Sequence, residues 1–146
     1  MPRSGSTLQD LTRNDWALIE SKARRMSVGL GQEIIQEGAR IDHLYVLRGG
    51  SASVELEVTT SRSVIAALNA GDVCGEMAFL GDRTATASVV AKDDVEVDAI
   101  WADDLRELIA AFPGFGVRFY RSLAVLLAQR LRQTSRELLR EMTNKR

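Results

Sequence analysis

Two residue types that supply much of enzyme chemistry are nearly missing from this sequence of 146 residues, which has one cysteine and one histidine. The lone Cys74 excludes an internal disulfide framework, so nothing points to an oxidising compartment. The lone His43 lies in an apolar run and cannot form a cluster of metal ligands, and no Ser/His/Asp or Cys/His set assembles around it. We therefore expect both residues to be structural, with no catalytic residues, no metal site and no enzymatic activity.

Long hydrophobic runs are also missing. No apolar stretch approaches the length that spans a bilayer, and the first ten residues contain no signal-peptide core. The hydrophobic fraction of 45% is nevertheless enough to build a buried core. The length suits one ordinary domain, so we expect a single domain over residues 1–146 in a cytoplasmic protein.

Charge is distributed unevenly along the chain. The stretch from Pro113 onward holds eight basic and two acidic residues, so its formal charge is +6, whereas the remainder has a charge of −7. A basic tail raises direct nucleic-acid binding as one possible function. However, the basic residues are spread around the expected helix, and only a few residues follow Met142, which leaves no room for a separate DNA-reading domain. A solvated helix, or attraction to an acidic surface or partner, is the favoured account.

The N-terminal part, residues 1–25, is expected to be helical after a disordered start over residues 1–6. Thr12 or Asn14 can cap the helix, and Trp16, Ile19 and Ala23 then recur at helical spacing.

Residues 26–101 have the pattern of an all-β region. Short β-rich runs are separated by glycines and polar turns, and in residues 52–58 apolar and polar residues alternate as in a strand with one wet face. The runs are residues 33–36, 43–49, 52–58, 63–68, 87–91 and 95–100. Many short strands at this spacing predict an antiparallel sandwich or barrel.

Two helices are expected after the β region, over residues 102–112 and 113–144. Pro113 separates them and suits the first position of the second helix. That helix carries one largely apolar stripe, formed by Phe119, Leu123, Leu127, Leu131, Thr134, Leu138 and Met142. Its last residues would extend beyond the β region, so we expect the stripe to pair with a second copy of the chain in a homodimer.

The segment with the most chemical content is residues 75–80, between two groups of strands. Gly75 allows the backbone to approach a ligand, and the Glu76 carboxylate can accept a hydrogen bond from a sugar hydroxyl. One turn of helix at Met77 and Ala78 would direct backbone N–H groups at a phosphate. Arg83, Thr84 and Thr86 follow and can add donors to phosphate oxygens, although β-propensity explains the threonines equally well.

This segment resembles the phosphate-binding cassette of the cyclic-nucleotide-binding domain family. The resemblance extends to three more glycine-punctuated stretches in the same order, residues 31–38, 44–50 and 71–76, and covers about residues 10–135. It implies a jelly-roll β-barrel followed by a hinge helix (102–112) and a long helix that moves with ligand occupancy. It also implies that Gly75 and Glu76 bind the ribose, that the backbone at Met77 and Ala78 binds the cyclic phosphate, and that residues 75–88 form the cassette.

The sequence departs from the family at the arginine that pairs with the phosphate. A gapless comparison places Ala85 at that position and Thr86 at the next one, whereas Arg83 lies two residues earlier. If residues 83–85 are extended, Arg83 and Ala85 point to the same side, and the long arginine side chain can partly compensate. Otherwise the site has lost its affinity for cyclic nucleotides, and Arg83 is a solvated loop residue.

The resulting prediction is a regulatory module that binds cAMP or cGMP and relays occupancy through its C-terminal helices. The alternative is a ligand-independent dimerisation or protein-interaction domain on the same fold.

Overall fold

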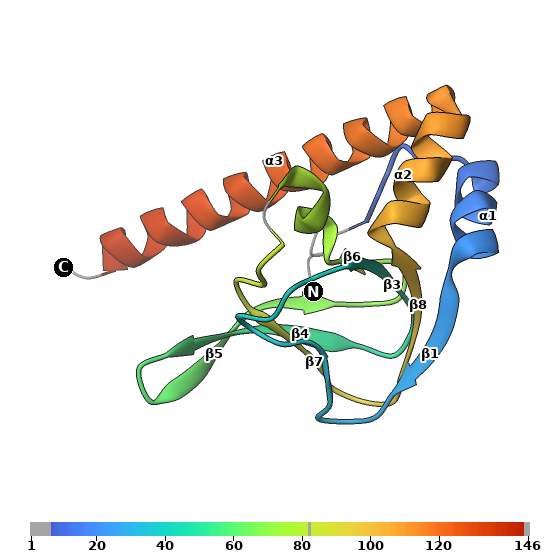
Figure 1. Cartoon of the computed structure of the whole chain (residues 1–146). Coiled ribbons are helices and arrows are strands. Elements are labelled where there is room, and N and C mark those ends of the chain that lie inside the picture. The colour runs from blue at the N-terminus through green and yellow to red at the C-terminus, as the bar shows by residue number, and fades with distance from the viewer. Residues whose placement is uncertain (1–6, 82, 145–146) are drawn as a thin grey trace.

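Two antiparallel sheets form the centre of the molecule, and helices cover one end (Figure 1). The computed structural model describes residues 7–81 and 83–144, so the disorder predicted for residues 1–6 lies outside the described residues. The strands are β1 (Arg24–Val28), β2 (Glu33–Ile35), β3 (His43–Gly49), β4 (Ala52–Val58), β5 (Ser61–Leu68), β6 (Val73–Cys74), β7 (Ser88–Ala91) and β8 (Val95–Trp101). They form two four-stranded sheets with the orders β1-β8-β3-β6 and β2-β7-β4-β5. The predicted mainly-β, antiparallel jelly-roll fold with flanking helices is confirmed.

All six strands predicted from the β-rich runs are present, and two further strands, β1 and β6, were not predicted. β1 pairs with β8 along its whole length, but four of its five residues are exposed. It therefore lacks the apolar alternation by which a half-buried strand is recognised. β6 has only two residues and pairs with β3 just before the cassette.

The helices are α1 (Arg13–Lys22), α2 (Ala102–Ala111) and α3 (Pro113–Asn144). Thr12 caps α1, since the backbone N–H of Asp15 donates to its hydroxyl while its own N–H donates to the Asp15 carboxylate. The predicted helical segment 1–25 was too long at its C-terminal end, because α1 stops at Lys22 and the chain enters β1 at Arg24.

Apolar residues form two cores. One lies between the two sheets and contains Leu47, Leu68, Val89 and Val97. The other packs the β3–β8 face against the helices; its α3 members are Phe115, Phe119, Leu123 and Leu126. From Leu131 onward every described residue of α3 is exposed, so the helix is anchored by its first half and extends beyond the body with its second half (Figure 1). None of the helices in the described part of the chain has the length and hydropathy of a bilayer-crossing segment.

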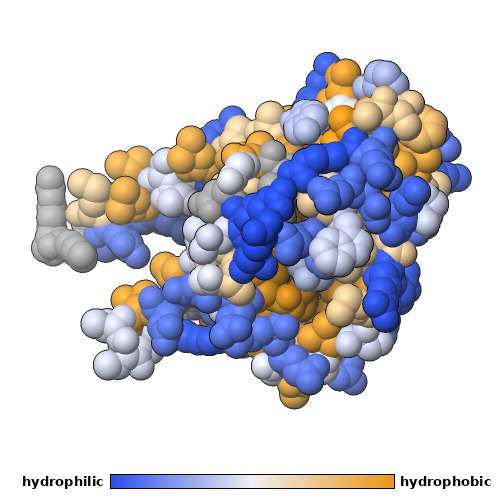
Figure 2. Space-filling model, viewed as in Figure 1, coloured by the Kyte–Doolittle hydropathy of each residue, from blue (hydrophilic) through white to orange (hydrophobic). Residues whose placement is uncertain are grey.

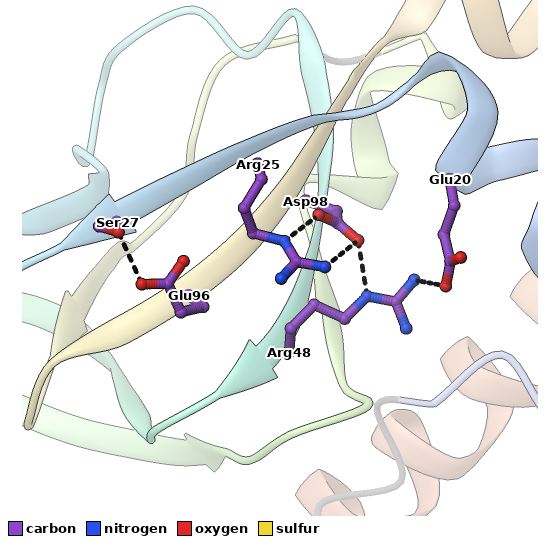
Figure 3. Close-up of polar contacts among 6 residues, drawn as sticks. All are labelled: Glu20, Arg25, Ser27, Arg48, Glu96 and Asp98. Atoms are coloured by element: carbon purple, nitrogen blue, oxygen red, sulfur yellow. Dashed lines mark hydrogen bonds and ion pairs between the residues drawn. The ribbon is translucent and has the colours of Figure 1, made fainter.

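Ion pairs join α1 to the sheet. The buried Asp98 carboxylate accepts from the Nε atoms of Arg25 and Arg48, each at 2.6 Å, and Arg48 also donates to Glu20 of α1 at 2.7 Å (Figure 3). Burial raises the pKa of Asp98, but the hydrogen bonds from the two arginines outweigh burial and leave it lowered. These contacts explain why a strand with mostly polar residues, β1, is held at this edge of the sheet.

Candidate functional site

A pocket of about 660 Å³ lies between the cassette, β5 and the middle of α3. Its inner wall is apolar and includes Ile35, Val54, Leu68 and Val89, all from the β2-β7-β4-β5 sheet. Polar groups come from the cassette on one side and from α3 on the other. An apolar cavity of this size with a few convergent polar groups is typical of small-molecule sites.

Gly75 determines how the cassette enters the pocket. Its φ of 84° is left-handed, and a Cβ built on it would collide with the backbone carbonyl oxygen of His43. Glycine is therefore required here for both its conformation and its lack of a side chain. The chain turns at Gly75 into a short 3₁₀ helix, η1 (Glu76–Leu80), which includes Met77 and Ala78.

Glu76 is buried, and its carboxylate lies in the pocket wall. The Nη1 atom of Arg130, from α3, donates to its Oε1 atom. The Arg130 side chain is 34% exposed, so the ion pair closes one side of the pocket while its cation remains in partial contact with solvent. The pocket lining thus includes Glu76, the carboxylate that the sequence motif singles out.

Ala85 occupies the place where the resemblance implies an arginine. It is 5% exposed and lines the pocket. Its backbone is fixed, because its N–H donates to Ala39 and its carbonyl accepts from Gly38, both at 2.8 Å. Thr84 and Thr86, on either side of it, also line the pocket, together with Met77.

Arg83 is placed differently from the compensating position that an extended segment allows. It is not among the residues that line the pocket, and its Nη1 atom lies 3.6 Å from the Asp42 carboxylate. The Arg83 carbonyl oxygen accepts a hydrogen bond from the backbone N–H of Ile41 at 2.6 Å. This bond connects the segment around Arg83 to the loop that precedes β3. Compensation by Arg83 therefore has no support in this geometry.

The sequence prediction missed the helix side of the pocket. Residues Arg130, Gln133, Thr134 and Glu137 of α3 line it, with the spacing of one helical face. The helical spacing puts Thr134 in the apolar stripe, but the structure places it in the polar pocket wall. The signal that could have revealed this face is a run of four polar residues at positions i, i+3, i+4 and i+7.

The two residues expected to be structural lie close to the cassette. Cys74 is buried, and burial raises the pKa of its thiol well above the ordinary range, as expected of a small core residue. The His43 ring packs against the Trp101 ring in a tilted arrangement with centroids 4.0 Å apart, and burial lowers the pKa of His43. Within the described residues, no group of three or more His, Cys, Asp or Glu side chains could hold a metal ion.

Comparison with known proteins matches this architecture. The family model for the cyclic nucleotide-binding domain matches residues 25–112. Cyclic GMP-binding protein C of Dictyostelium discoideum is 30% identical over 129 residues, covering 88% of this chain and 5% of that protein. Cyclic AMP receptor protein of Thermus thermophilus is 31% identical over 109 residues, covering 74% of this chain and 49% of that protein.

A solved structure agrees with these relatives. The catabolite activator protein of Thermus thermophilus superposes with a TM-score of 0.77 at 29% identity, over 90% of this chain and 60% of that one. The chain thus spans less than half of the length of either of these two curated relatives. From the family model, the fold and the placement of Gly75 and Glu76 in the pocket, we conclude that the chain belongs to the cyclic nucleotide-binding domain family.

Proposed function

We propose that this chain is a non-enzymatic sensor module that binds cAMP or cGMP in the pocket and relays occupancy through α2 and α3. The observation that carries the proposal is the buried Glu76 carboxylate, held in the pocket wall by a turn that only glycine can make and contacted from α3 by Arg130. A buried carboxylate requires a donor, and the free 2′-hydroxyl of the ribose in a cyclic nucleotide supplies one.

The rest of the pocket supports the same ligand class. The ribose would lie at Gly75 and Glu76, and the cyclic phosphate would lie near the η1 backbone at Met77 and Ala78 and near Thr84 and Thr86. The base would then face α3, where Gln133 and Thr134 offer hydrogen-bond donors and acceptors. The Thermus and Dictyostelium relatives carry the names of cAMP- and cGMP-binding proteins, which favours the same two nucleotides.

The relay follows from the position of α3. The helix is anchored in the core by Phe115, Phe119 and Leu123, and one turn after its last buried residue it lines the pocket at Arg130. A ligand that changes the contacts of Arg130 therefore acts on the exposed half of the same helix. The ligand can shift the equilibrium between two positions of α3 only by the difference in its affinity for them.

Homodimerisation is the output that we propose. In the exposed half of α3, Leu131, Leu138, Leu139 and Met142 are each more than half exposed. Figure 2 shows apolar side chains along this part of the helix, which stands apart from the β4–β5 hairpin. Exposed leucines on a projecting helix are stabilised by pairing with a second helix. We place the protein in the cytoplasm, in keeping with its unpaired cysteine.

A ligand-independent dimerisation or protein-interaction domain is the second candidate function. The specific observation in its favour is Ala85, which removes the phosphate-pairing charge from the cassette. Direct binding of nucleic acid through the basic residues of α3 is a weaker candidate, because these residues are spread around the helix.

The decisive experiment compares a cyclic nucleotide with its 2′-deoxy form, by calorimetry on the wild type and on Glu76→Gln. If the 2′-hydroxyl donates to Glu76, the wild type binds the ribo form roughly tenfold more tightly, and the preference disappears in the variant. An equal preference in both proteins would contradict the placement of the ribose.

A further inference from the structure

The pocket has an unusual charge balance for a site that accepts an anion. Among its described lining residues, the charged side chains are Glu76 and Glu137, both acidic, and Arg130. Ala85 contributes no charge, and the basic residues nearest in sequence to Arg130 on the helix, such as Arg132, are exposed and outside the lining. An anionic ligand placed in this pocket needs a positive partner, because charge-assisted bonds to phosphate are the strong ones.

We infer that Arg130 is the residue that recognises the charge of the cyclic phosphate, in place of the missing cassette arginine. This inference rests on the proposed function. On binding, the Arg130 guanidinium would leave the Glu76 carboxylate and donate to the phosphate oxygens. Glu76 would then accept a hydrogen bond from the ribose 2′-hydroxyl.

The two exchanges depend on each other. Glu76 is buried, so losing Arg130 without a replacement donor would leave an unpaired charge in the pocket wall. The ribose 2′-hydroxyl supplies that donor at the same time as the phosphate attracts the arginine. The site therefore selects ligands that carry both groups, and neither group alone allows the exchange to complete.

The arginine has the properties that the exchange requires. Its side chain is one-third exposed, long, and on a helix that faces the cassette, so the guanidinium can change partners without unpacking the core. The last buried core residue of α3 is Leu126, one turn earlier. Arg83 cannot serve instead, because it lies outside the lining beside Asp42.

This assignment also makes α3 a direct sensor of the ligand. In a cassette with its own arginine, the phosphate charge is satisfied within the β region. Here the charge is satisfied from the helix, so occupancy and helix position are linked by one side chain. A ligand that lacks the negative charge would occupy the pocket without taking Arg130 from Glu76.

The test measures ligand charge against the arginine. Calorimetry would compare cAMP with its uncharged phosphate methyl ester, which keeps the ring, ribose and base, on the wild type, Arg130→Gln, Arg130→Lys and the matched helix control Arg132→Gln. We expect the wild type and Arg132→Gln to prefer the anion by roughly tenfold to hundredfold. Arg130→Gln should lose this preference, and Arg130→Lys should keep part of it.

The ratio of the two affinities separates recognition from a structural effect. Any disturbance of the pocket caused by Arg130→Gln weakens both ligands and cancels in the ratio. If Arg130→Gln kept the full preference for the anion, the inference would be wrong while the proposed function stood. If neither ligand bound the wild type at millimolar concentration, the proposed function would fail and the inference would fail with it.

Discussion

The guanidinium of Arg130 donates to the buried carboxylate of Glu76 across 54 residues of sequence. One residue belongs to the cassette and the other to the long C-terminal helix, so the two parts of the site are joined before any ligand is considered. The pair gives Glu76 the partner that a buried carboxylate needs. It also means that a ligand hydroxyl must compete with an arginine for that carboxylate.

Restoring the cassette arginine should strengthen nucleotide binding. Ala85 is buried in the pocket wall, and its replacement in Ala85→Arg would extend into a cavity of about 660 Å³. We expect the affinity for cAMP to rise roughly tenfold to hundredfold, because a charge-assisted bond to phosphate is added. Calorimetry measures this gain.

The uncharged control for this substitution is Ala85→Gln, which fills similar space without the charge. It should bind no more tightly than the wild type. An equal gain in both variants would mean that packing, and not charge, limits the affinity of the pocket.

Removing the arginine within the cassette itself should have no effect on binding. Arg83 pairs with Asp42 outside the pocket lining, so Arg83→Ala should change the affinity for cAMP by less than about twofold, as surface substitutions away from a site usually do. Calorimetric titration of Arg83→Ala with cAMP measures this change in affinity. A large loss would restore Arg83 as the phosphate partner and contradict its placement here.

The ion pair between α1 and α3 should make the fold sensitive to acid. Asp15 is buried and accepts from Arg118 at 2.6 and 2.9 Å, and these hydrogen bonds hold its pKa at about 2, below the ordinary 3.8. A lowered pKa stabilises the fold at pH values above the ordinary one, and this contribution is lost as the pH falls from about 4 towards 2. Urea unfolding at a series of pH values measures it.

The matched variant is Asp15→Asn, which keeps an oxygen to accept from Thr12 but removes the charge. We expect it to lower the free energy of unfolding by about 1–3 kcal/mol at pH 7, and the difference from the wild type to shrink below pH 4. A difference that stayed constant down to pH 2 would show that the charge of Asp15 contributes nothing.

The exposed leucines of α3 should control self-association. Leu138 is 57% exposed and is not among the described residues that line the pocket, so Leu138→Glu should weaken a helix-paired dimer at least tenfold by burying a charge at its interface. Sedimentation equilibrium of the wild type and the variant measures the dissociation constant. Leu138→Gln removes the leucine without adding a charge and so separates the two effects, and a monomeric wild type would contradict the proposed output.

Most of the fold could be predicted from the sequence, since its cues are local. The alternation around Val54 predicts β4, but the predicted wet face is wrong, since Ser53 and Glu55 are buried and Val58 is exposed. Pro113 separates α2 from α3 as the structure has it. β1 could not be predicted, because it is held by pairing with β8 and by Arg25 bound to Asp98, which are contacts between residues distant in sequence. A polar strand of this kind carries no periodic signal.

The cassette side of the site could be predicted from its residue types, whereas the helix side could not. Gly75 and Glu76 lie where the motif predicts, and the reason for the glycine, the His43 carbonyl, is a tertiary contact. In the sequence, nothing distinguishes Arg130 from the other basic residues of the α3 segment. Only the tertiary structure, in which α3 leaves the core after Leu127, shows which face of the helix lines the pocket.

The most direct test of the account is calorimetric titration of the wild-type chain with cAMP and with cGMP, alongside Glu76→Ala. We predict saturable binding of at least one of the two nucleotides by the wild type, and loss of that binding in the variant, which removes the carboxylate at the centre of the pocket. No binding of either nucleotide at millimolar concentration, or binding that Glu76→Ala leaves unchanged, would contradict it.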